Sequence, residues 1–428
     1  MLKVLVMIFT GIIVSFYYFP FEFSFLPGMN TKMGLAVVGI FLAVRNLIRK
    51  REIKFPHNLV RVEALAVLVS VVGIVSVIVN NTSDYAYATY FVSMTVWLSG
   101  AYTVCLLIKR VHSRLTIDRV TAYLAVVCAA QCLLALLIDS NVVIKSVVDT
   151  YIMQDQQFLN EIKRLYGIGA SLDTAGVRFS ACLILLMFVI NKRKADMSNI
   201  GIMLSVVIYL WIAVVGNMMA RTTIVGVALS MIYAIITFSP QRVSYSFFRI
   251  LKAGLIVIIL AVPICVYLYE NSQQFYHLSR FAFEGFFNLI ETGEWEIDSN
   301  ERLKTMIAFP DNIKTWIIGD GYFENPYYTD PYYVGYQLGG YYMGTDIGYC
   351  RFIFYFGLTG LFAFVFFLAS VARECVILMP KYKLLVIFIL LLGFVVWLKV
   401  ATDVFLVMAL ILCVGNMQED TNKYEDSI

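Results

Sequence analysis

The chain has 428 residues, of which 60% are hydrophobic and only 14% are charged. Soluble domains carry about 25% charged residues, so this chain has too few polar side chains to cover the surface of a soluble protein. The formal net charge of +4 is uninformative as a total, and we expect no nucleic-acid partner. Repeated apolar runs of about 17–25 residues predict an all-α polytopic integral membrane protein, because about 20 apolar residues in a helix cross a bilayer.

Twelve apolar runs predict about twelve transmembrane helices in a single transmembrane domain that covers residues 1–428. They lie at residues 2–19, 33–49, 62–80, 86–108, 120–138, 176–191, 199–218, 222–239, 253–270, 347–371, 384–399 and 401–416. No small-residue cleavage site follows the first run, so we expect no cleaved signal peptide. Lys399 and Asp403 interrupt the last two runs, and their spacing would let them pair on one face if these runs formed a single helix.

Lysine and arginine residues are concentrated in alternate connections between these runs. The basic connections lie within residues 45–61, 109–119, 192–194, 242–252 and 373–383. Cytoplasmic loops carry the excess of basic residues in membrane proteins, so both termini are predicted to be cytoplasmic, with a cytoplasmic tail at 417–428. The long loops at 139–175 and 270–346 then face outward.

The two long loops contain amphipathic stretches that predict short helices at the membrane interface. In the first loop, residues 150–166 have apolar side chains at helical spacing. In the larger loop, a similar stripe predicts a helix at about 272–291. A further short helix is predicted at about 300–309, where Asp298 and Glu301 have capping-box spacing.

Four arginines lie on the outward-facing side of the predicted membrane domain: Arg178, Arg221, Arg302 and Arg351. Arginine is expensive at hydrocarbon depth and usually faces a cavity or a partner, and its guanidinium group binds phosphate oxygens with two hydrogen bonds. Several such groups around one cavity would bind a lipid diphosphate. The alternative is that each arginine reaches a lipid headgroup or forms a structural ion pair. The functional interpretation is strongest for Arg221, because its very short turn needs no charge.

Two carboxylates on the same side are candidates for acting on a sugar hydroxyl. Asp346 precedes the tenth predicted span, and Glu301 is adjacent to Arg302, with which it would pair. A carboxylate at the membrane surface can position a hydroxyl or remove its proton. For Asp346 the alternative is a capping role, because the helix dipole favours a negative charge at the first turn.

The larger loop is rich in tyrosine and contains a turn with two glycines. Gly319-Asp320-Gly321 predicts a tight turn that allows close backbone approach, and Trp316 precedes it. Tyrosine is common at membrane interfaces, and a dense cluster also offers rings and hydroxyl groups to a carbohydrate. The tyrosines are Tyr322, Tyr327, Tyr328, Tyr332, Tyr333, Tyr336, Tyr341, Tyr342 and Tyr349.

Several common active-site patterns are missing from the sequence. His57, His112 and His277 are too scattered to build a metal site, and the eight cysteines lie in or at the ends of apolar runs without a disulfide pattern. The sequence has no phosphate-binding loop and no dinucleotide fingerprint. We therefore expect neither a metal nor another cofactor.

Layout and short motifs together suggest a family. The layout is about twelve spans, cytoplasmic termini and one dominant outer loop late in the chain. The motifs are Ala220-Arg221-Thr222, Arg302 followed by Trp316 and Gly319-Asp320-Gly321, Asp346-Ile347-Gly348-Tyr349 followed by Gly357 and Gly360, and Gly176-Val177-Arg178-Phe179-Ser180. This combination resembles the O-antigen polymerase and O-antigen ligase superfamily of bacterial envelope glycosyltransferases. Ligases of this superfamily carry a histidine where this chain has Asp346, so the resemblance favours a polymerase.

The resemblance implies a GT-C-like fold in the bacterial inner membrane, with an active site that faces the periplasm. It implies polymerisation of undecaprenyl-diphosphate-linked oligosaccharide repeat units into O-antigen or a similar surface polysaccharide, with a chain-length regulator protein as a further partner. Catalysis would use Arg221, Arg302, Asp346 and Glu301. Substrate binding would use Arg178, Arg351, Tyr349, Gly319, Gly321, Tyr322 and Trp316.

Two alternatives remain open. An O-antigen ligase would transfer finished glycan to lipid A-core, and a flippase or other transporter would move the lipid-linked oligosaccharide without transferring it. Flippases also have about twelve spans but seldom need a loop this long. Charged residues deep in several spans would favour transport, whereas nearly all charges in this chain lie at predicted helix ends.

Overall fold

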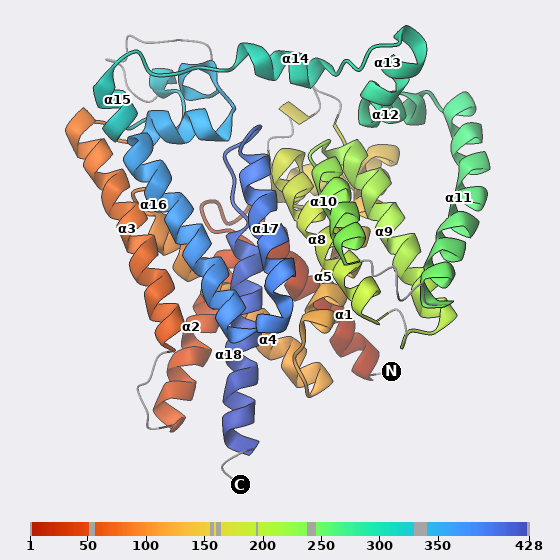
Figure 1. Ribbon diagram of the computed structural model, residues 1–428, viewed down its shortest axis with the longest axis horizontal. Coiled ribbons are helices and arrows are strands. Elements are labelled where there is room, and N and C mark those ends of the chain that lie inside the picture. Colours follow the sequence, from red (N-terminus) through yellow and green to blue (C-terminus); the bar gives the residue numbers. More distant parts are fainter. Residues whose placement is uncertain are drawn as a thin grey trace. The chain divides into compact units, whose positions relative to one another are not determined.

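The computed structural model describes residues 2–50, 56–154, 158–159, 164–193, 196–237, 245–328 and 340–425. These residues are mainly helical (Figure 1). A helix lies at each place where the sequence predicts a span. The bounds are α1 Leu2–Tyr18, α2 Thr31–Lys50, α3 His57–Asn80, α4 Tyr90–His112, α5 Ile117–Ser140, α8 Leu172–Arg193, α9 Asn199–Met219, α10 Thr223–Ile236, α11 Tyr245–Asn271, α16 Gly348–Leu378, α17 Lys383–Val396 and α18 Phe405–Glu425.

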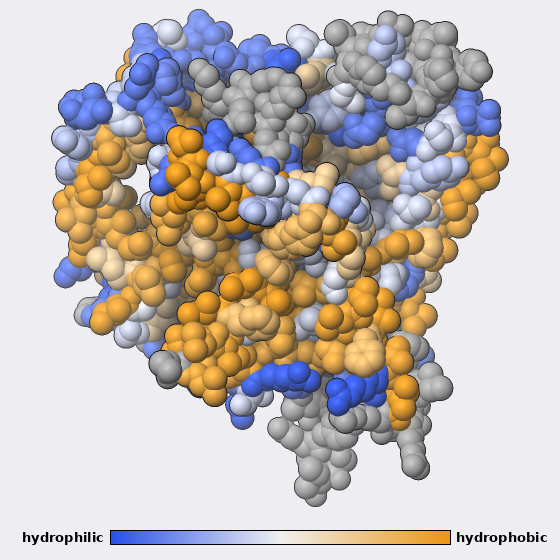
Figure 2. Space-filling model, turned by 180° about the vertical axis from the view of Figure 1, so that it is seen from behind, coloured by the Kyte–Doolittle hydropathy of each residue, from blue (hydrophilic) through white to orange (hydrophobic). Residues whose placement is uncertain are grey.

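Eight helices in the described part of the chain are long and apolar enough to cross a membrane: α2, α3, α4, α5, α8, α9, α11 and α16. The apolar segments of α1, α10 and α18 are shorter, and α17 has 14 residues. The prediction of an all-α, multi-pass membrane protein is therefore confirmed. On the face shown in Figure 2, hydrophobic residues cover the sides of the helices and hydrophilic residues gather toward their ends, as expected for helices surrounded by lipid.

The connections contain short elements. They are β1 Glu22–Phe23, α6 Val142–Tyr151, β2 Ile152–Met153, α12 Gln273–Ala282, α13 Glu284–Thr292, α14 Asp298–Thr305, α15 Ile313–Ile318, and the 3₁₀ turns η2 Pro326–Tyr328, η3 Tyr342–Gly344 and η4 Pro380–Tyr382. The two strands pair antiparallel, with Glu22 opposite Met153 and Phe23 opposite Ile152.

The chain divides into two compact units. Unit 1 contains Met1–Leu35 and Val104–Glu296, and unit 2 contains Ala36–Thr103 and Ile297–Ile428. The helices α2 and α4 pass from one unit to the other. The large loop at 270–346 is divided after Glu296, so its first part belongs to unit 1 and the rest to unit 2.

In unit 1, α8 packs against α5, α9 and α10, and Figure 1 shows α8, α9 and α10 side by side. A hydroxyl group joins two of these helices, because Ser180 donates to the Thr222 carbonyl oxygen at 3.0 Å and accepts from the Gly226 backbone N–H at 3.1 Å. Such bonds between membrane helices are worth roughly 1 kcal/mol each. The helix α11 packs against α9 but leaves Ile259 and Leu260 60% and 64% exposed, which fits contact with lipid.

In unit 2, α16 packs against α3, α15, α17 and α18. Aromatic rings fill the space around the first half of α16. The Tyr87 ring centroid lies 5.5 Å from that of Phe352 and 5.4 Å from that of Phe356, and Trp397 lies 4.8 Å from Phe352, all with edge-to-face geometry. Each such pair adds about 0.5–1.5 kcal/mol beyond its buried area, so the start of α16 is held firmly.

The first long loop differs from its prediction. Instead of a helix over residues 150–166, the helix α6 ends at Tyr151 and β2 follows it directly. Residues 158–159 are helical and 164–167 are not, and 155–157 and 160–163 lie outside the described residues. The strand forms because Ile152 pairs with Phe23 from a distant part of the sequence, and helical periodicity within the loop carries no information about such a partner.

The larger loop also differs in detail. The stripe at 272–291 forms two helices, α12 and α13, which meet at Phe283, a residue whose φ/ψ of −119° and 27° are not helical. The next helix begins at Asp298, and its N-cap residue is Ile297. Asp298 is therefore not at the cap position, and the expected capping box does not form. The Glu301 carboxylate instead pairs with Lys304, with 2.6 Å between Oε1 and Nζ.

The last two helices are separate. Lys399 and Asp403 lie in the non-helical segment between α17 and α18, so they do not share a helix face. The Asp403 carboxylate accepts the backbone N–H of Phe405, the first residue of α18, at 2.9 Å. The aspartate thus stabilises the start of a new helix rather than pairing along a single one.

Candidate functional site

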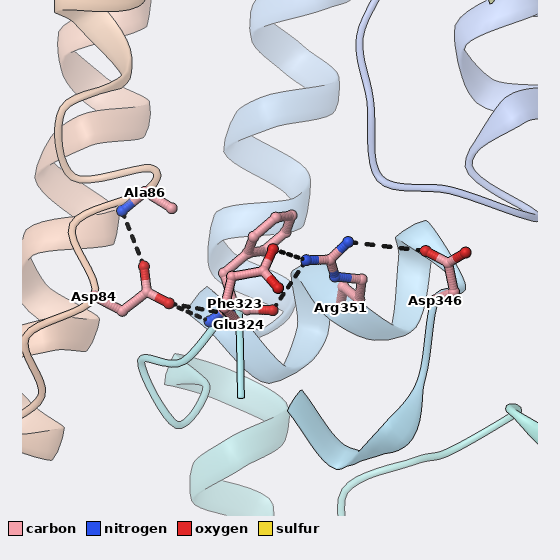
Figure 3. A network of polar contacts seen from close by, with 6 residues as sticks. All are labelled: Asp84, Ala86, Phe323, Glu324, Asp346 and Arg351. Atoms are coloured by element: carbon pink, nitrogen blue, oxygen red, sulfur yellow. Dashed lines mark hydrogen bonds and ion pairs between the residues drawn. The ribbon is translucent and has the colours of Figure 1, made fainter. Parts of the chain in front are cut away.

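Arg351 is the centre of a polar network in unit 2 (Figure 3). It lies in the first turn of α16, and its side chain is only 5% exposed. The guanidinium Nη2 donates to the Glu324 carboxylate at 2.6 Å and to the Phe323 carbonyl oxygen at 3.1 Å. Its Nη1 lies 3.9 Å from the Asp346 carboxylate. The buried cation is therefore compensated by two carboxylates and a carbonyl group.

Aromatic rings cover the same guanidinium group. The Cζ atom of Arg351 lies 3.8 Å from the Phe323 ring centroid and 4.4 Å from the Tyr341 ring centroid. An antiparallel β-bridge pairs Glu324 with Tyr341. It brings Tyr341 and Phe323, the residue before Glu324, to the arginine. Cation–π contacts are worth about 0.5–2 kcal/mol, so they help to keep this arginine in place.

Asp84 anchors the network to the connection between α3 and α4. Its carboxylate accepts the backbone N–H groups of Phe323 at 2.7 Å, Glu324 at 3.2 Å and Ala86 at 3.1 Å (Figure 3). Hydrogen bonds to an ionised carboxylate are about twice as strong as neutral ones. The backbone that presents Glu324 to Arg351 is thus fixed in position.

The predicted turn at Gly319-Asp320-Gly321 forms and packs against a break in α16. Both glycines have positive φ, 84° and 75°. The α16 backbone leaves helical geometry at Phe356 and Gly357, and this frees carbonyl groups of the preceding turn. The Asp320 and Gly321 N–H groups donate to the carbonyl oxygens of Phe354 and Tyr355 at 2.6 and 3.0 Å. The two glycines therefore have a structural role at this junction.

Asp320 connects the turn to the tyrosine-rich segment. Its carboxylate accepts the Thr315 hydroxyl at 2.6 Å and the Tyr342 hydroxyl at 3.2 Å. The Tyr322 ring lies 5.3 Å from the Tyr342 ring. Three of the predicted tyrosines, Tyr332, Tyr333 and Tyr336, lie outside the described residues.

Two other predicted substrate-binding residues have protein partners. The Trp316 indole N–H donates to the Pro310 carbonyl oxygen at 2.9 Å. The Tyr349 hydroxyl donates to the Phe394 carbonyl oxygen at 3.0 Å, and its ring contacts Trp397 edge-to-face. Through these bonds, both side chains contribute to the packing of unit 2.

Glu301 and Arg302 are exposed on α14. Glu301 pairs with Lys304 rather than with its neighbour. Within the described part of the chain, the Arg302 guanidinium forms no ion pair at 4.0 Å or less. Arg302 is therefore open to solvent or to a ligand.

Arg221 belongs to unit 1 and forms a partly buried ion pair. It lies in the tight turn between α9 and α10, and its Nη1 is 2.5 Å from Oε2 of Glu284 at the start of α13. The two side chains are 17% and 16% exposed. Cζ of Arg221 also lies 4.0 Å from the ring centroid of Phe281.

A second arginine contacts the same ring. Cζ of Arg164 lies 3.5 Å from the Phe281 ring centroid. Burial, together with the positive charge of Arg221, lowers the pKa of Arg164 to about 10, so it remains a cation at neutral pH. No sequence pattern places Arg164, Phe281 and Glu284 at one site, although Phe281 belongs to the predicted amphipathic stripe.

Arg178 lies in the second turn of α8 in the same unit. Its Cζ is 5.7 Å from the Phe19 ring centroid, and its backbone carbonyl accepts the Tyr18 hydroxyl at 2.8 Å. The segments that carry Arg178 and Arg221 are adjacent, because Asp173 at the start of α8 accepts a hydrogen bond from the Thr222 hydroxyl. The structure therefore brings two of the sequence motifs together.

The predicted site residues fall into two groups. Arg178 and Arg221 belong to unit 1, whereas the other nine belong to unit 2. Their convergence on one active site therefore stays a prediction. Among the described residues, no three His, Cys, Asp or Glu side chains are grouped so that they could hold a metal ion. No protein-family model, curated protein or solved structure matches this chain.

Proposed function

We propose that this protein is a membrane glycosyltransferase that polymerises lipid-diphosphate-linked oligosaccharide units at the outer face of the bacterial inner membrane. The proposal includes twelve spans in a GT-C-like arrangement, cytoplasmic termini and a periplasmic active site. It includes undecaprenyl-diphosphate-linked oligosaccharide as the substrate and a chain-length regulator protein as a partner. The resemblance of the motifs and the chemistry of the buried arginines support it.

The observation that carries the proposal is the environment of Arg221. This arginine lies at the ends of two apolar helices, where burial of a charge is costly and usually marks a cavity or a functional partner. Arg164 adds a second positive charge beside the same Phe281 ring. Glu284 and Asp173 offset part of this positive charge, and a lipid diphosphate, which carries more negative charge than one carboxylate, would compete with Glu284 for Arg221.

The proposed reaction is a displacement at the anomeric carbon of the donor sugar. A hydroxyl oxygen of the acceptor forms the new glycosidic bond as the bond to the diphosphate oxygen breaks. The leaving lipid diphosphate keeps the electron pair, and Arg221 and Arg302, with Arg178 in support, would neutralise it. The acceptor proton would pass to Asp346 or Glu301. The aromatic residues of the large loop would support substrate binding, and Arg351 would hold that loop in place.

Substitution of Arg221 tests the proposal. In cells that depend on this protein, we expect Arg221→Ala to shorten or abolish the lipopolysaccharide ladder at unchanged protein level, with partial recovery in Arg221→Lys. Removing one such charge-stabilising donor costs roughly 100–1,000-fold in rate. Arg280→Ala is the matched control, because Arg280 is paired with Glu291 outside the Phe281 site. Normal long chains in Arg221→Ala would refute the assignment.

The role of Arg302 needs a separate test because the residue is exposed. Arg302→Ala should shorten the ladder, whereas Lys314→Ala, which removes an exposed cation from α15 in the same loop, should leave it unchanged. Equal ladders in the two variants would exclude Arg302 from the reaction.

Substitution of Asp346 tests the proposed base. An unchanged chain-length distribution in Asp346→Asn would exclude Asp346 as the base.

A further inference from the structure

Unit 1 contains a cavity of about 420 Å³ at one end of α5. Its walls come from α5, α6, the segment before α8, and α12. The lining residues are Ala135, Ile138, Asp139, Lys145, Leu159, Arg164, Tyr166, Gln274, His277, Leu278 and Phe281. Cavities of about 300–1,000 Å³ are the usual size for small-molecule sites, so the volume suits one or two sugar rings.

One wall of the cavity is apolar and firmly held. Ile138, Leu159 and Tyr166 belong to a buried cluster. The Gln131 amide donates to the Ile168 carbonyl and accepts the Ile168 N–H, both at 3.0 Å, and so fixes the neighbouring segment to α5. The Tyr166 hydroxyl donates to the Asp149 carboxylate at 2.8 Å. This wall offers C–H surface to a ligand.

Another part of the lining is polar. Gln274 on α12 donates a hydrogen bond to the carboxylate of Asp139 at the end of α5. This bond uses one amide hydrogen, so the amide oxygen and the second carboxylate oxygen are still able to bind hydroxyl groups. His277 lies one turn further along α12 and adds a ring nitrogen to the lining.

Two cations complete the cavity. Arg164 lines it with its guanidinium group against Phe281, and Lys145 lines it from α6. In the described part of the chain, neither side chain has a carboxylate within 4.0 Å. The lining thus carries two cations against the single carboxylate of Asp139, while Asp173 and Glu284 offset part of the Arg164 charge from outside the lining. This balance suits a ligand with one negative charge better than a phosphate monoester, which carries about −1.5 to −2.

We propose that this cavity binds a carboxylate-bearing sugar of the lipid-linked oligosaccharide, with Arg164 and Lys145 on the carboxylate and with Asp139 and Gln274 on ring hydroxyl groups. The choice of a saccharide rests on the proposed function. Arg221 is not among the lining residues, so this site is a recognition site beside the arginine assigned to the diphosphate. It would select polymer units that contain an acidic sugar.

A binding experiment tests this site without any transfer reaction. The full chain in phosphatidylcholine nanodiscs is titrated with glucuronate, glucose and inorganic phosphate by ligand-observed NMR. Glucuronate differs from glucose in carrying a carboxylate, and it should bind at least about tenfold more tightly, equivalent to about 1.4 kcal/mol. Equal binding of the two sugars, or displacement of glucuronate by lower concentrations of phosphate, would overturn the proposal.

Matched variants locate the binding. Lys145→Gln should lower glucuronate affinity at least about fivefold without changing glucose affinity, and Lys145→Arg should restore it. Arg164→Gln should act in the same direction, but Arg164 also packs on Phe281, so Lys145 provides the cleaner test. Lys304→Gln in unit 2 serves as a control that removes an exposed cation elsewhere. Unchanged glucuronate affinity in Lys145→Gln would refute the site.

The two proposals fail in different ways. A normal ladder in Arg221→Ala together with Lys145-dependent glucuronate binding would refute the polymerase assignment and support the acidic-sugar site. A short ladder in Arg221→Ala together with equal binding of glucuronate and glucose would refute only the site.

Discussion

Two buried arginines, one in each unit, have opposite surroundings. Arg351 in unit 2 has carboxylates from Glu324 and Asp346, a backbone carbonyl and two aromatic rings around it. Arg221 in unit 1 pairs with Glu284 and has a second cation, Arg164, beside the same ring. The first environment sets two carboxylates against one cation, whereas the second sets two carboxylates, Glu284 and Asp173, against two cations.

This difference indicates which arginine has a structural role and which is available to bind a ligand. A cation that its own protein fully compensates has little to gain from an added anion, because the anion would have to displace a carboxylate. Two adjacent cations gain more stabilisation from an added anion, because the anion reduces their mutual repulsion. We therefore interpret the Arg351 network mainly as a structural connection that supports the loop, and the surroundings of Arg221 as the stronger candidate for anion binding.

The largest expected effect is on the backbone junction that supports the Arg351 network. Gly357 has φ of 69°, and a Cβ atom there would collide with the Ile317 carbonyl group. Gly357→Ala should destabilise the protein by at least about 3 kcal/mol, seen as a lower thermal unfolding temperature in detergent. Gly254→Ala, where no atom lies within 4 Å of the added methyl group, should have almost no effect. Similar unfolding temperatures for both variants would contradict the proposed rigidity of the junction.

A smaller effect is expected at the partner of Arg221. Glu284→Gln removes the carboxylate that is paired with Arg221, and this should cost about 1–3 kcal/mol of stability. The control is Glu291→Gln on the same helix, because Glu291 pairs with Arg280 near the surface and its loss should lower the unfolding temperature less than the loss of Glu284. Thermal unfolding of both purified variants measures the difference. If Glu291→Gln lowered the unfolding temperature more than Glu284→Gln, the surroundings of Arg221 would not be short of negative charge.

The smallest effect is expected for Glu324→Gln. The Glu324 side chain is 60% exposed, so water screens its ion pair with the buried Arg351. The loss should be less than about 1 kcal/mol, because the Phe323 carbonyl and Asp346 still compensate the arginine. A loss above about 2 kcal/mol, measured by the same unfolding assay, would mean that Glu324 is the main anion of this network.

Much of the fold follows from local sequence patterns. Each apolar run forms a helix, because a long apolar segment can satisfy its own backbone hydrogen bonds in lipid. The turn at Gly319-Asp320-Gly321 was also predictable, since glycine alone adopts positive φ without strain. The helix predicted over 150–166 was wrong at residues 152–154 and 164–166, where the backbone is not helical, although 150–151 and 158–159 are helical. At Ile152 the chain instead pairs with a strand that lies far away in the sequence.

The candidate site was predictable only in part. Arg178, Arg221 and Arg351 could be identified because a charge beside an apolar run is unusual. Their partners could not, because Glu284 is 63 positions from Arg221 in the chain and only the packing of α13 brings it within 2.5 Å. Arg164 gave no signal either, since it lies in a polar loop where arginine is common.

By itself, the sequence determined that this protein is helical and spans a membrane, because hydrophobicity and helical hydrogen bonding are local properties of a segment. Only the tertiary structure decided which arginines are compensated. The charge balance around a side chain depends on residues that fold back from elsewhere, such as Glu324 and Asp346 around Arg351. Coulomb energies depend on distance in space, and that distance is set by packing rather than by position in the chain.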